Sequence, residues 1–247
     1  MGHQPRVRQG VLLGLLFLAL IPPQHGCRAE AHEGKLRLAI TGDKYPTTGE
    51  AHFYADAAKI QQAILHTSPF DEYADIIDFK VVWNASSLGC THSTTMSRLI
   101  TCNMAQTTAA LNTAAVDYDH IIVVVNDGSY GGSGGSLTVT YNGAQMVEVV
   151  KHEFGHTFGG LLDEYLLYGS NGTVQNRLQA NIYLAPTVPA TVPGKWTVKG
   201  YRPNYSKQRV VKADGTFTSS LMEALGKPFN EISKSRLRER LEQYRQS

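Results

Sequence analysis

His152, Glu153 and His156 are the residues whose types and spacing most clearly indicate chemistry. The two histidines are four residues apart, so on a helix they lie on one face with their imidazoles converging. Histidines at this spacing are typical of two of the three protein ligands of a catalytic zinc, and a glutamate between them is placed to act as a general base. The pattern therefore predicts a metal-dependent hydrolase with Zn²⁺ as its cofactor.

The residues around this motif indicate a helix with one buried face. Apolar residues recur at helical spacing before and within it, namely Met146, Val149, Val150, Phe154 and Phe158. Gly159 and Gly160 follow and are expected to end the helix. For the five residues 152–156 taken by themselves, the alternative to a metal site is a surface helix that carries two unrelated histidines. Asp163 and Glu164 come next, where a third ligand from a separate segment could reach the metal.

The first 31 residues have the features of a secretory signal peptide. A short basic stretch precedes the apolar run Val11–Ile21, and Ala29-Glu30-Ala31 fits the small-x-small pattern of a cleavage site. The apolar run is too short for a stable membrane span, so cleavage after Ala31 and secretion are expected. A lipid anchor on Cys27 is the less favoured alternative, because the residues before it make a poor lipid-attachment box.

Residues 32–247 are long enough for one well-cored domain, and we expect a single catalytic domain there, without a prodomain. The formal net charge of the chain is only +2, and no basic stripe interleaved with aromatic residues is present. Nucleic acid is therefore not an expected partner, whereas a protein or peptide substrate is. The expected oligomeric state is a monomer.

Cys90 and Cys102 are an even pair in the exported part of the chain, and such a pair predicts a disulfide. The alternative, a thiol metal site, needs more ligands than this pair and the nearby His92 provide. We therefore expect a short loop closed by a disulfide, which would stabilise the fold by about 2–4 kcal/mol.

Hydrophobic patterning predicts an α/β or α+β fold, a mixed twisted sheet with the metal-site helix packed across it. Strands are expected at 36–40, 76–82, 120–125 and 137–141, helices at about 49–66 and after Asn142-Gly143, and a helix or irregular region at 103–114. Residues 137–141 suit an edge strand, and the glycine-rich stretch 129–136 suits a flexible connection. The last third is expected to be largely irregular until a final helix with the apolar side Ile232, Leu237, Leu241 and Tyr244.

The chain resembles the bacterial IgA-specific metalloendopeptidase family of zincins. The segment from Val147 to Tyr165 is similar to the active-site signature of that family. Other similar blocks follow in the same order, namely Ile40–Tyr45, Pro69-Phe70, Gly89-Cys90, Val125–Gly132, Arg202-Pro203, Ser219–Met222 and Pro228-Phe229. The resemblance implies a zincin-like catalytic core and a zinc-dependent peptidase.

The same resemblance implies that His152 and His156 bind zinc and that Glu153 is the catalytic base. Metzincin-like enzymes place the third ligand six residues after the second histidine, where this chain has a leucine, which cannot bind a metal. Asp163 comes one residue later and is the expected third ligand, with the doubled glycine absorbing the extra step. Glu164 is the alternative, because its longer side chain could reach the metal from a different turn.

The C-terminal segment contains three further residues that the resemblance singles out. Met222 resembles the methionine of the turn beneath the zinc in metzincins, and the alternative is an ordinary core methionine. Family members usually carry cysteines where this chain has Ser220 and Asn230, so a second disulfide is not expected. The late segment is then expected to be held by packing alone.

The function that these observations predict is that of a secreted zinc-dependent endopeptidase in which Glu153 activates a water molecule. Tyr165, Tyr201 and Tyr205 are candidates for the donor that stabilises the oxyanion, and the strand at 137–141 is a candidate for holding an extended substrate. One alternative is an inactive secreted binding or adhesion protein, and another is a zinc hydrolase of non-peptide amides. Immunoglobulin A is not implied as the substrate.

Overall fold

The computed structural model describes residues 34–165, 177–178, 181–185, 196–198, 208–212 and 220–247. The chain divides into two units, residues 1–31 and 32–247, and all described residues belong to the second. The predicted signal peptide and Cys27 therefore lie outside the described residues. Within the described ranges, none of the helices has both the length and the apolar character needed to cross a membrane.

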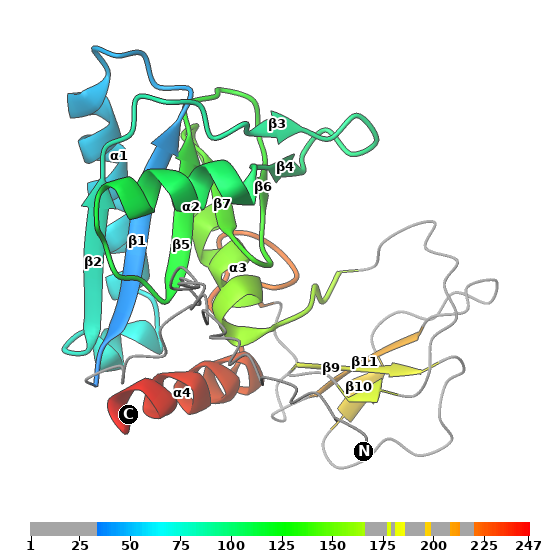
Figure 1. The fold of residues 1–247 in the computed structure, drawn as a ribbon. Helices are drawn as coiled ribbons and strands as arrows, with labels where there is room; N and C mark the ends of the chain where they lie inside the picture. Colours follow the sequence, from blue (N-terminus) through cyan, green and yellow to red (C-terminus); the bar gives the residue numbers. More distant parts are fainter. Residues whose placement is uncertain (1–33, 166–176, 179–180, 186–195, 199–207, 213–219) are drawn as a thin grey trace, which may run out of the picture. The chain divides into compact units, whose positions relative to one another are not determined.

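The centre of the fold is a five-stranded sheet with the strand order β2-β1-β5-β7-β6 (Figure 1). Its strands are β1 (Leu36–Asp43), β2 (Ile77–Val82), β5 (His120–Val125), β6 (Gly132–Ser133) and β7 (Thr138–Tyr141). Strands β2, β1, β5 and β7 run parallel, and β6 pairs antiparallel with β7. The residues of β1 and β5 are buried almost throughout, because this parallel sheet is covered on both faces.

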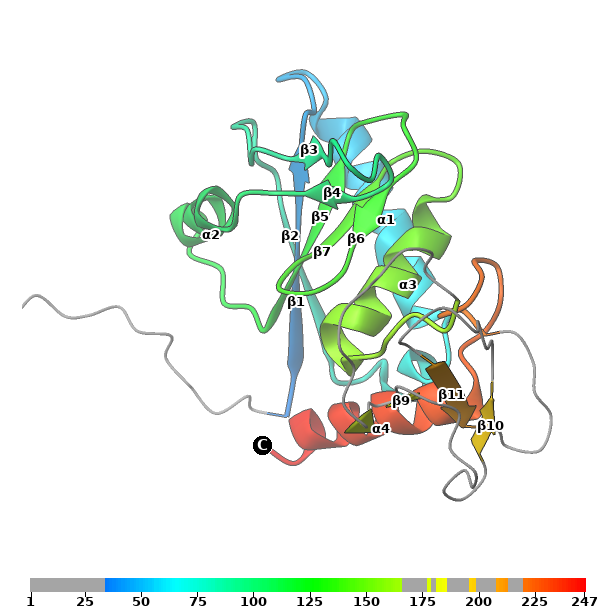
Figure 2. The same ribbon diagram turned by 90° about the vertical axis from the view of Figure 1, so that its right-hand side faces the viewer.

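Helices cover both faces of this sheet (Figure 2). They are α1 (Glu50–Leu65), α2 (Met104–Thr113), α3 (Met146–Gly159) and α4 (Glu231–Arg245). Ile40 and Ile122 belong to the core that β1 and β5 share with α1, α3 and α4. Val123 points the other way, into a core that contains Leu111 of α2. Side chains alternate along a strand, so these two cores lie on opposite faces of the sheet. The predicted α+β zincin-like fold, with a mixed sheet and the motif-bearing helix across it, is confirmed.

The prediction that residues 137–141 form an edge strand is wrong. Strand β7 lies between β5 and β6, and all four of its residues are buried. The glycine-rich stretch that was expected to be a flexible connection folds back to form β6, so that Gly132 lies opposite Thr140. The alternation of threonine and valine favoured an edge strand, but Thr140 is fully buried and its hydroxyl donates to the carbonyl oxygen of Met146 at 3.2 Å.

A small hairpin lies next to β6. Its two strands are β3 (Thr91–His92) and β4 (Ile100–Thr101). The predicted disulfide between Cys90 and Cys102 is confirmed and joins the two ends of this hairpin. Leu99 forms a parallel bridge with Gly132, whose N–H donates to the carbonyl oxygen of Arg98 at 3.0 Å. The hairpin is therefore tied to the outer side of β6.

The C-terminal part contains more regular structure than the sequence predicted. Four short strands form an antiparallel sheet with the order β10-β11-β9-β8. They are β8 (Arg177–Leu178), β9 (Ile182–Ala185), β10 (Trp196–Val198) and β11 (Gln208–Lys212). Strands of two to five residues are too short for a recognisable alternation, so the expectation of an irregular segment missed them.

The predicted final helix is present as α4. It begins after Asn230, whose side-chain oxygen accepts from the N–H of Ser233 at 2.9 Å. Leu237, Leu241 and Tyr244 are buried, as their helical spacing predicted, whereas Ile232 of the same predicted side is only partly buried.

Candidate metal centre

Helix α3 carries the two histidines, and apolar burial on its other side fixes its position. Val150 and Phe154 are fully buried in the core beneath the sheet. His152 and His156 lie four residues apart on the side of the helix that faces a cleft. The spacing of the apolar residues therefore also determines where the imidazoles point.

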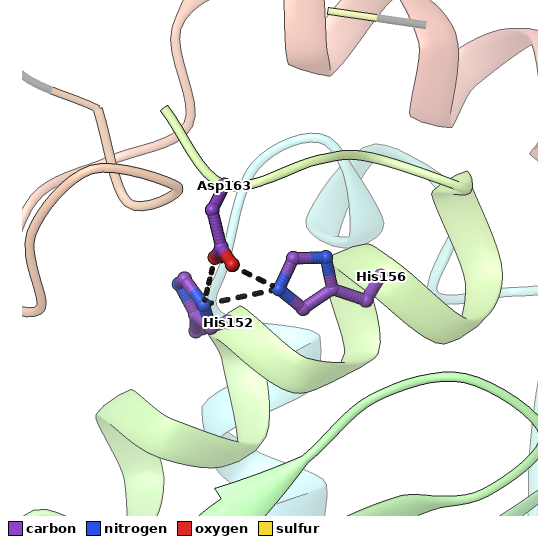
Figure 3. Close-up of side chains that lie close together, drawn as sticks. All are labelled: His152, His156 and Asp163. Atoms are coloured by element: carbon purple, nitrogen blue, oxygen red, sulfur yellow. Dashed lines mark hydrogen bonds and ion pairs between the residues drawn. The ribbon is translucent and has the colours of Figure 1, made fainter. Parts of the chain in front are cut away.

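The turn after α3 brings the next segment back over the histidines. Gly160 caps the helix with φ = 62°, in the left-handed region that favours glycine. The N–H of Leu161 then donates to the carbonyl oxygen of Gly155 at 3.2 Å. Figure 3 shows the chain running back above the two rings, so that Asp163 points at both of them.

Three side-chain atoms meet at this point, as Figure 3 shows. Asp163 Oδ1 lies 3.1 Å from His152 Nε2 and 3.1 Å from His156 Nε2. The two Nε2 atoms are themselves 3.1 Å apart. A tetrahedral zinc with bonds of about 2.0–2.1 Å would hold its ligand atoms about 3.3 Å apart. The triangle thus has the size that one zinc ion requires.

The other nitrogen of each imidazole shows which atoms carry lone pairs. His152 Nδ1 lies 2.9 Å from the carbonyl oxygen of Leu221, and His156 Nδ1 lies 2.7 Å from that of Leu161. A carbonyl oxygen only accepts, so each Nδ1 is assigned the proton and each neutral ring presents a lone pair at Nε2. With this assignment three lone-pair atoms face one point, an arrangement that could hold a metal ion.

The electrostatics of the cluster point the same way. Burial raises the pKa of the Asp163 carboxyl, but its contacts with the two imidazoles outweigh this and hold the pKa well below its ordinary value. Burial lowers the pKa of His156, but its contact with Asp163 raises that pKa by more, so the net shift is upward. Both shifts have the same cause, the close contact between the Asp163 carboxylate and the imidazoles.

Glu153 lines the same cleft as the three ligand candidates. Burial raises the pKa of its carboxyl, and the neighbouring His152 and His156 only partly offset that effect. The sequence predicted Glu153 beside the metal ligands, and in the structure it lines the cleft together with the three candidate ligands.

The cleft has a volume of 710 Å³ and is open to solvent. One wall comes from the disulfide-closed hairpin, with Met96, Arg98 and Leu99. The rest of its lining includes Tyr130, Gly132, Ser133, Gly134, Gly135, Leu162, Tyr165, Glu223, Ala224 and Leu225. A cleft of this size lies within the range of about 300–1,000 Å³ that is usual for ligand-binding sites.

Tyr165 is one of the three tyrosines proposed from the sequence as an oxyanion donor, and it lines this cleft. Its ring stacks on that of His152, with centroids 6.4 Å apart and planes at 19°. Burial and the nearby Asp163 carboxylate raise its pKa above the ordinary value, so it keeps its proton. Tyr201 and Tyr205 lie outside the described residues.

Glu164, the alternative third ligand, is engaged elsewhere. It is 1% exposed, and its carboxylate accepts hydrogen bonds from Asn181, Ser220 and Asn230 at 2.7–3.1 Å. The set of residues whose ligand atoms converge includes Asp163 and not Glu164. The expectation that packing alone holds the late segment is also wrong, because Ser220 and Asn230 are both bound to this carboxylate.

Met222 lies against α3 beneath the metal cluster. It is fully buried, and a Cβ built on Gly155 would come within 3.0 Å of its Sδ atom. Gly155 lies between the two histidines in the chain, so the methionine packs directly under the helical turn that carries them. Met222 is thus a core residue and also lies beneath the site.

Sequence reasoning did not find Asn181, and it noted Ser220 and Asn230 only as missing cysteines. Asn181 is fully buried, and its side-chain oxygen accepts from the N–H of Leu162 at 2.8 Å. No pattern marked these three residues, because each acts through a partner that is distant in the chain. A polar residue in an apolar context next to a regular element is the signal that could have indicated Asn230, which caps α4.

The site and fold define a class: an α+β protein with a candidate metal centre in an open cleft. A family model described as IgA Peptidase M64 matches residues 28–190, about two thirds of the chain, and the chain belongs to this peptidase family. The protein is therefore a peptidase, a hydrolase of a metallopeptidase family. The match ends before Arg202, so the resemblance stated for later blocks stays a prediction. Among curated proteins, none matched this sequence.

Proposed function

We propose that this protein is a secreted zinc-dependent endopeptidase whose ligands are His152 Nε2, His156 Nε2 and Asp163 Oδ1. The observation that carries the proposal is the triangle of three lone-pair atoms, each 3.1 Å from the other two. Two imidazoles and one carboxylate are a donor set that suits zinc. The peptidase family supplies the reaction class.

Glu153 is proposed as the general base. Zinc with three protein ligands supplies a Lewis acid and an open position for water. Glu153 accepts a proton from the attacking water and passes it to the leaving amine. Tyr165 is proposed to donate its hydroxyl proton in a hydrogen bond to the oxyanion, because it lines the cleft and stays protonated.

The substrate is proposed to be an extended segment of a protein or peptide chain that lies along the cleft between the hairpin wall and residues 223–225. A substrate strand cannot pair with β7, because β6 already occupies the outer side of β7. Residues 132–135, which are β6 and the two glycines after it, line the cleft, so we place the substrate backbone beside them. The family's name gives no ground for assigning immunoglobulin A to this chain.

Secretion is supported by the Cys90–Cys102 disulfide, because such bonds persist in oxidising compartments. We propose that residues 1–31 are removed as a signal peptide and that residues 32–247 act as one catalytic domain and as a monomer. N-terminal sequencing of the secreted protein and its mass in solution test these points. An N-terminus that retains residues 1–31 would contradict the proposed processing.

The test of the function is hydrolysis of casein and of a peptide library by the purified protein, with Glu153→Gln as the variant. We expect kcat to fall by about 10²–10⁴-fold, the usual contribution of a general base, with one zinc per chain retained. Glu50→Gln, an exposed glutamate on α1, is the matched control and should cleave as the wild type does.

Zinc bound without cleavage of any peptide would contradict the peptidase proposal and favour a binding protein. Cleavage of small amides but not of peptides would favour the non-peptide hydrolase.

A further inference from the structure

We propose that Glu164 and Asn181 are positioning residues that hold Asp163 at the metal, and that they set the affinity for zinc. This inference rests on the proposed function, since it concerns the same metal centre. In this proposal Glu164 does not bind the metal but holds the neighbouring Asp163 in place. The inference also adds Asn181, which belongs to neither the motif nor its helix.

Glu164 is the centre of a buried polar junction. Its Oε2 accepts from Ser220 Oγ at 2.7 Å, and its Oε1 accepts from the Nδ2 atoms of Asn181 at 3.1 Å and Asn230 at 3.0 Å. Its own N–H donates to the carbonyl oxygen of Met222 at 2.7 Å. The residue directly after Asp163 is therefore fixed through both its side chain and its backbone.

Asn181 fixes the residue directly before Asp163. Its Oδ1 accepts from the N–H of Leu162 at 2.8 Å, and its Nδ2 donates to the carbonyl oxygen of Leu162 at 2.8 Å. Asn181 is 0% exposed, so water does not compete for these bonds. With Leu162 and Glu164 both held, the backbone at Asp163 has little freedom to move away from the imidazoles.

The same junction reaches one of the histidines. Ser220 Oγ accepts from the N–H of Met222 at 3.2 Å, and Leu221 between them accepts from His152 Nδ1 at 2.9 Å. Movement of Ser220 would therefore shift the carbonyl that orients His152. Outer partners of this kind fix ligand geometry, and their loss typically weakens metal binding by about 10–100-fold.

The test is the zinc dissociation constant of the purified full chain, measured by competition with a chromophoric chelator. Glu164→Gln replaces one accepting oxygen by an amide that faces the donors, and Asn181→Leu removes the bonds to Leu162 and Glu164 with the same number of side-chain heavy atoms. We expect each variant to bind zinc about 10–100-fold more weakly. The kcat of the zinc-saturated variants should change much less than their zinc affinity.

Asp56→Asn is the matched control. Asp56 is also fully buried, and its carboxylate accepts from a hydroxyl, Tyr45 Oη, at 2.8 Å, from an amide, Asn142 Nδ2, at 3.2 Å and from Lys59 Nζ at 2.9 Å. It lies on α1, away from the cleft lining. We expect Asp56→Asn to lower thermal stability but to leave the zinc affinity within about twofold of wild type.

Wild-type zinc affinity in both Glu164→Gln and Asn181→Leu would overturn the inference and leave the proposed function intact. A wild-type protein that binds no zinc would overturn both. Ser220→Ala removes a single donor to Glu164 and covers the case in which Glu164→Gln does not fold. It should weaken zinc binding in the same direction, and an unchanged affinity would count against the inference.

Discussion

The helix half of the metal centre and the loop half are held in different ways. His152, Glu153 and His156 lie on α3, which is anchored by fully buried apolar side chains such as Val150 and Phe154. Asp163 lies on an irregular return segment that is anchored by buried hydrogen bonds to residues 19–66 positions further along the chain. Apolar burial is non-directional, whereas hydrogen bonds fix direction and distance.

The comparison teaches that the two halves should fail differently. A helix packed by several apolar residues tolerates the loss of one contact, because the others still hold it. The return segment depends on a few polar pairs, each of which leaves a buried partner unsatisfied when it is broken, at about 1–3 kcal/mol. Loss of one packing contact around α3 should therefore leave the metal ligands in place, whereas loss of one hydrogen bond around the return segment should weaken metal binding.

The largest expected effect comes from removing one ligand from each half. His156→Ala and Asp163→Ala should both lose zinc and lower kcat/KM by about a thousandfold or more, because several kcal/mol of transition-state stabilisation disappears. Zinc content after desalting and peptide hydrolysis are the measurements. His66→Ala, an exposed histidine at the end of α1, should retain both.

An Asp163→Ala variant that keeps its zinc, with loss of zinc in Glu164→Ala instead, would show that the loop half is assigned to the wrong carboxylate.

The helix half could be predicted from the sequence, because its information is local. Val150, Phe154 and Phe158 repeat at helical spacing, and the four-residue step between His152 and His156 then fixes how the imidazoles face each other. Strand β5 was found for the same reason, since residues 121–125 are a continuous apolar run, and β1 was found because Leu36, Leu38, Ala39 and Ile40 are apolar.

For the loop half, the sequence limited the third metal ligand to two adjacent carboxylates without deciding between them. Asp163 and Glu164 differ in their hydrogen-bond partners, which lie far along the chain. No sequence pattern around Asn181 or Ser220 indicates that they are those partners. The error at β7 has the same origin. Whether Thr140 is buried depends on where residues 132–133 pair, and periodicity within one strand does not contain that information.

The disulfide tests whether the hairpin wall is independent of the metal centre. Cys90→Ser with Cys102→Ser should lower the free energy of unfolding by about 2–4 kcal/mol, the amount expected for a disulfide between residues 12 apart in the chain. The KM for peptides should rise, since Arg98 and Leu99 line the cleft, while zinc affinity should stay the same. Denaturant unfolding measures the stability, and chelator competition measures the zinc affinity. A large fall in zinc affinity would contradict the independence of the hairpin wall from the metal centre.

Gly160 forms the turn that connects the helix half to the loop half. Gly160→Ala places a Cβ on a residue with φ = 62°, which should cost about 1–2 kcal/mol in stability. Because this turn directs the chain back over the histidines, zinc binding should weaken as well. Gly128→Ala is the matched control, since Gly128 has no positive φ and a Cβ there meets nothing within 4 Å. Equal urea midpoints for the two variants would contradict a role for this turn.

The smallest expected effect concerns acid stability at Asp127, which is not among the residues that line the cleft. The N–H of Ser129 and then Lys44 lower the pKa of Asp127 to about 2. An ionised Asp127 therefore stabilises the fold above its unfolded pKa of about 3.9, and this contribution is lost as the pH falls to about 2. The stability difference between wild type and Asp127→Asn should shrink over that range in urea titrations. A constant difference would show that the charge of Asp127 does not contribute.

The central claim is that one zinc ion binds where the helix half and the loop half meet. The most direct measurement is anomalous scattering at the zinc edge from crystals of the purified protein. The account predicts one zinc peak bonded to His152 Nε2, His156 Nε2 and Asp163 Oδ1, with the Glu164 carboxylate still bound to Ser220 and Asn230. A peak bonded to Glu164 instead, or no zinc at this cluster in protein shown to contain zinc, would contradict it.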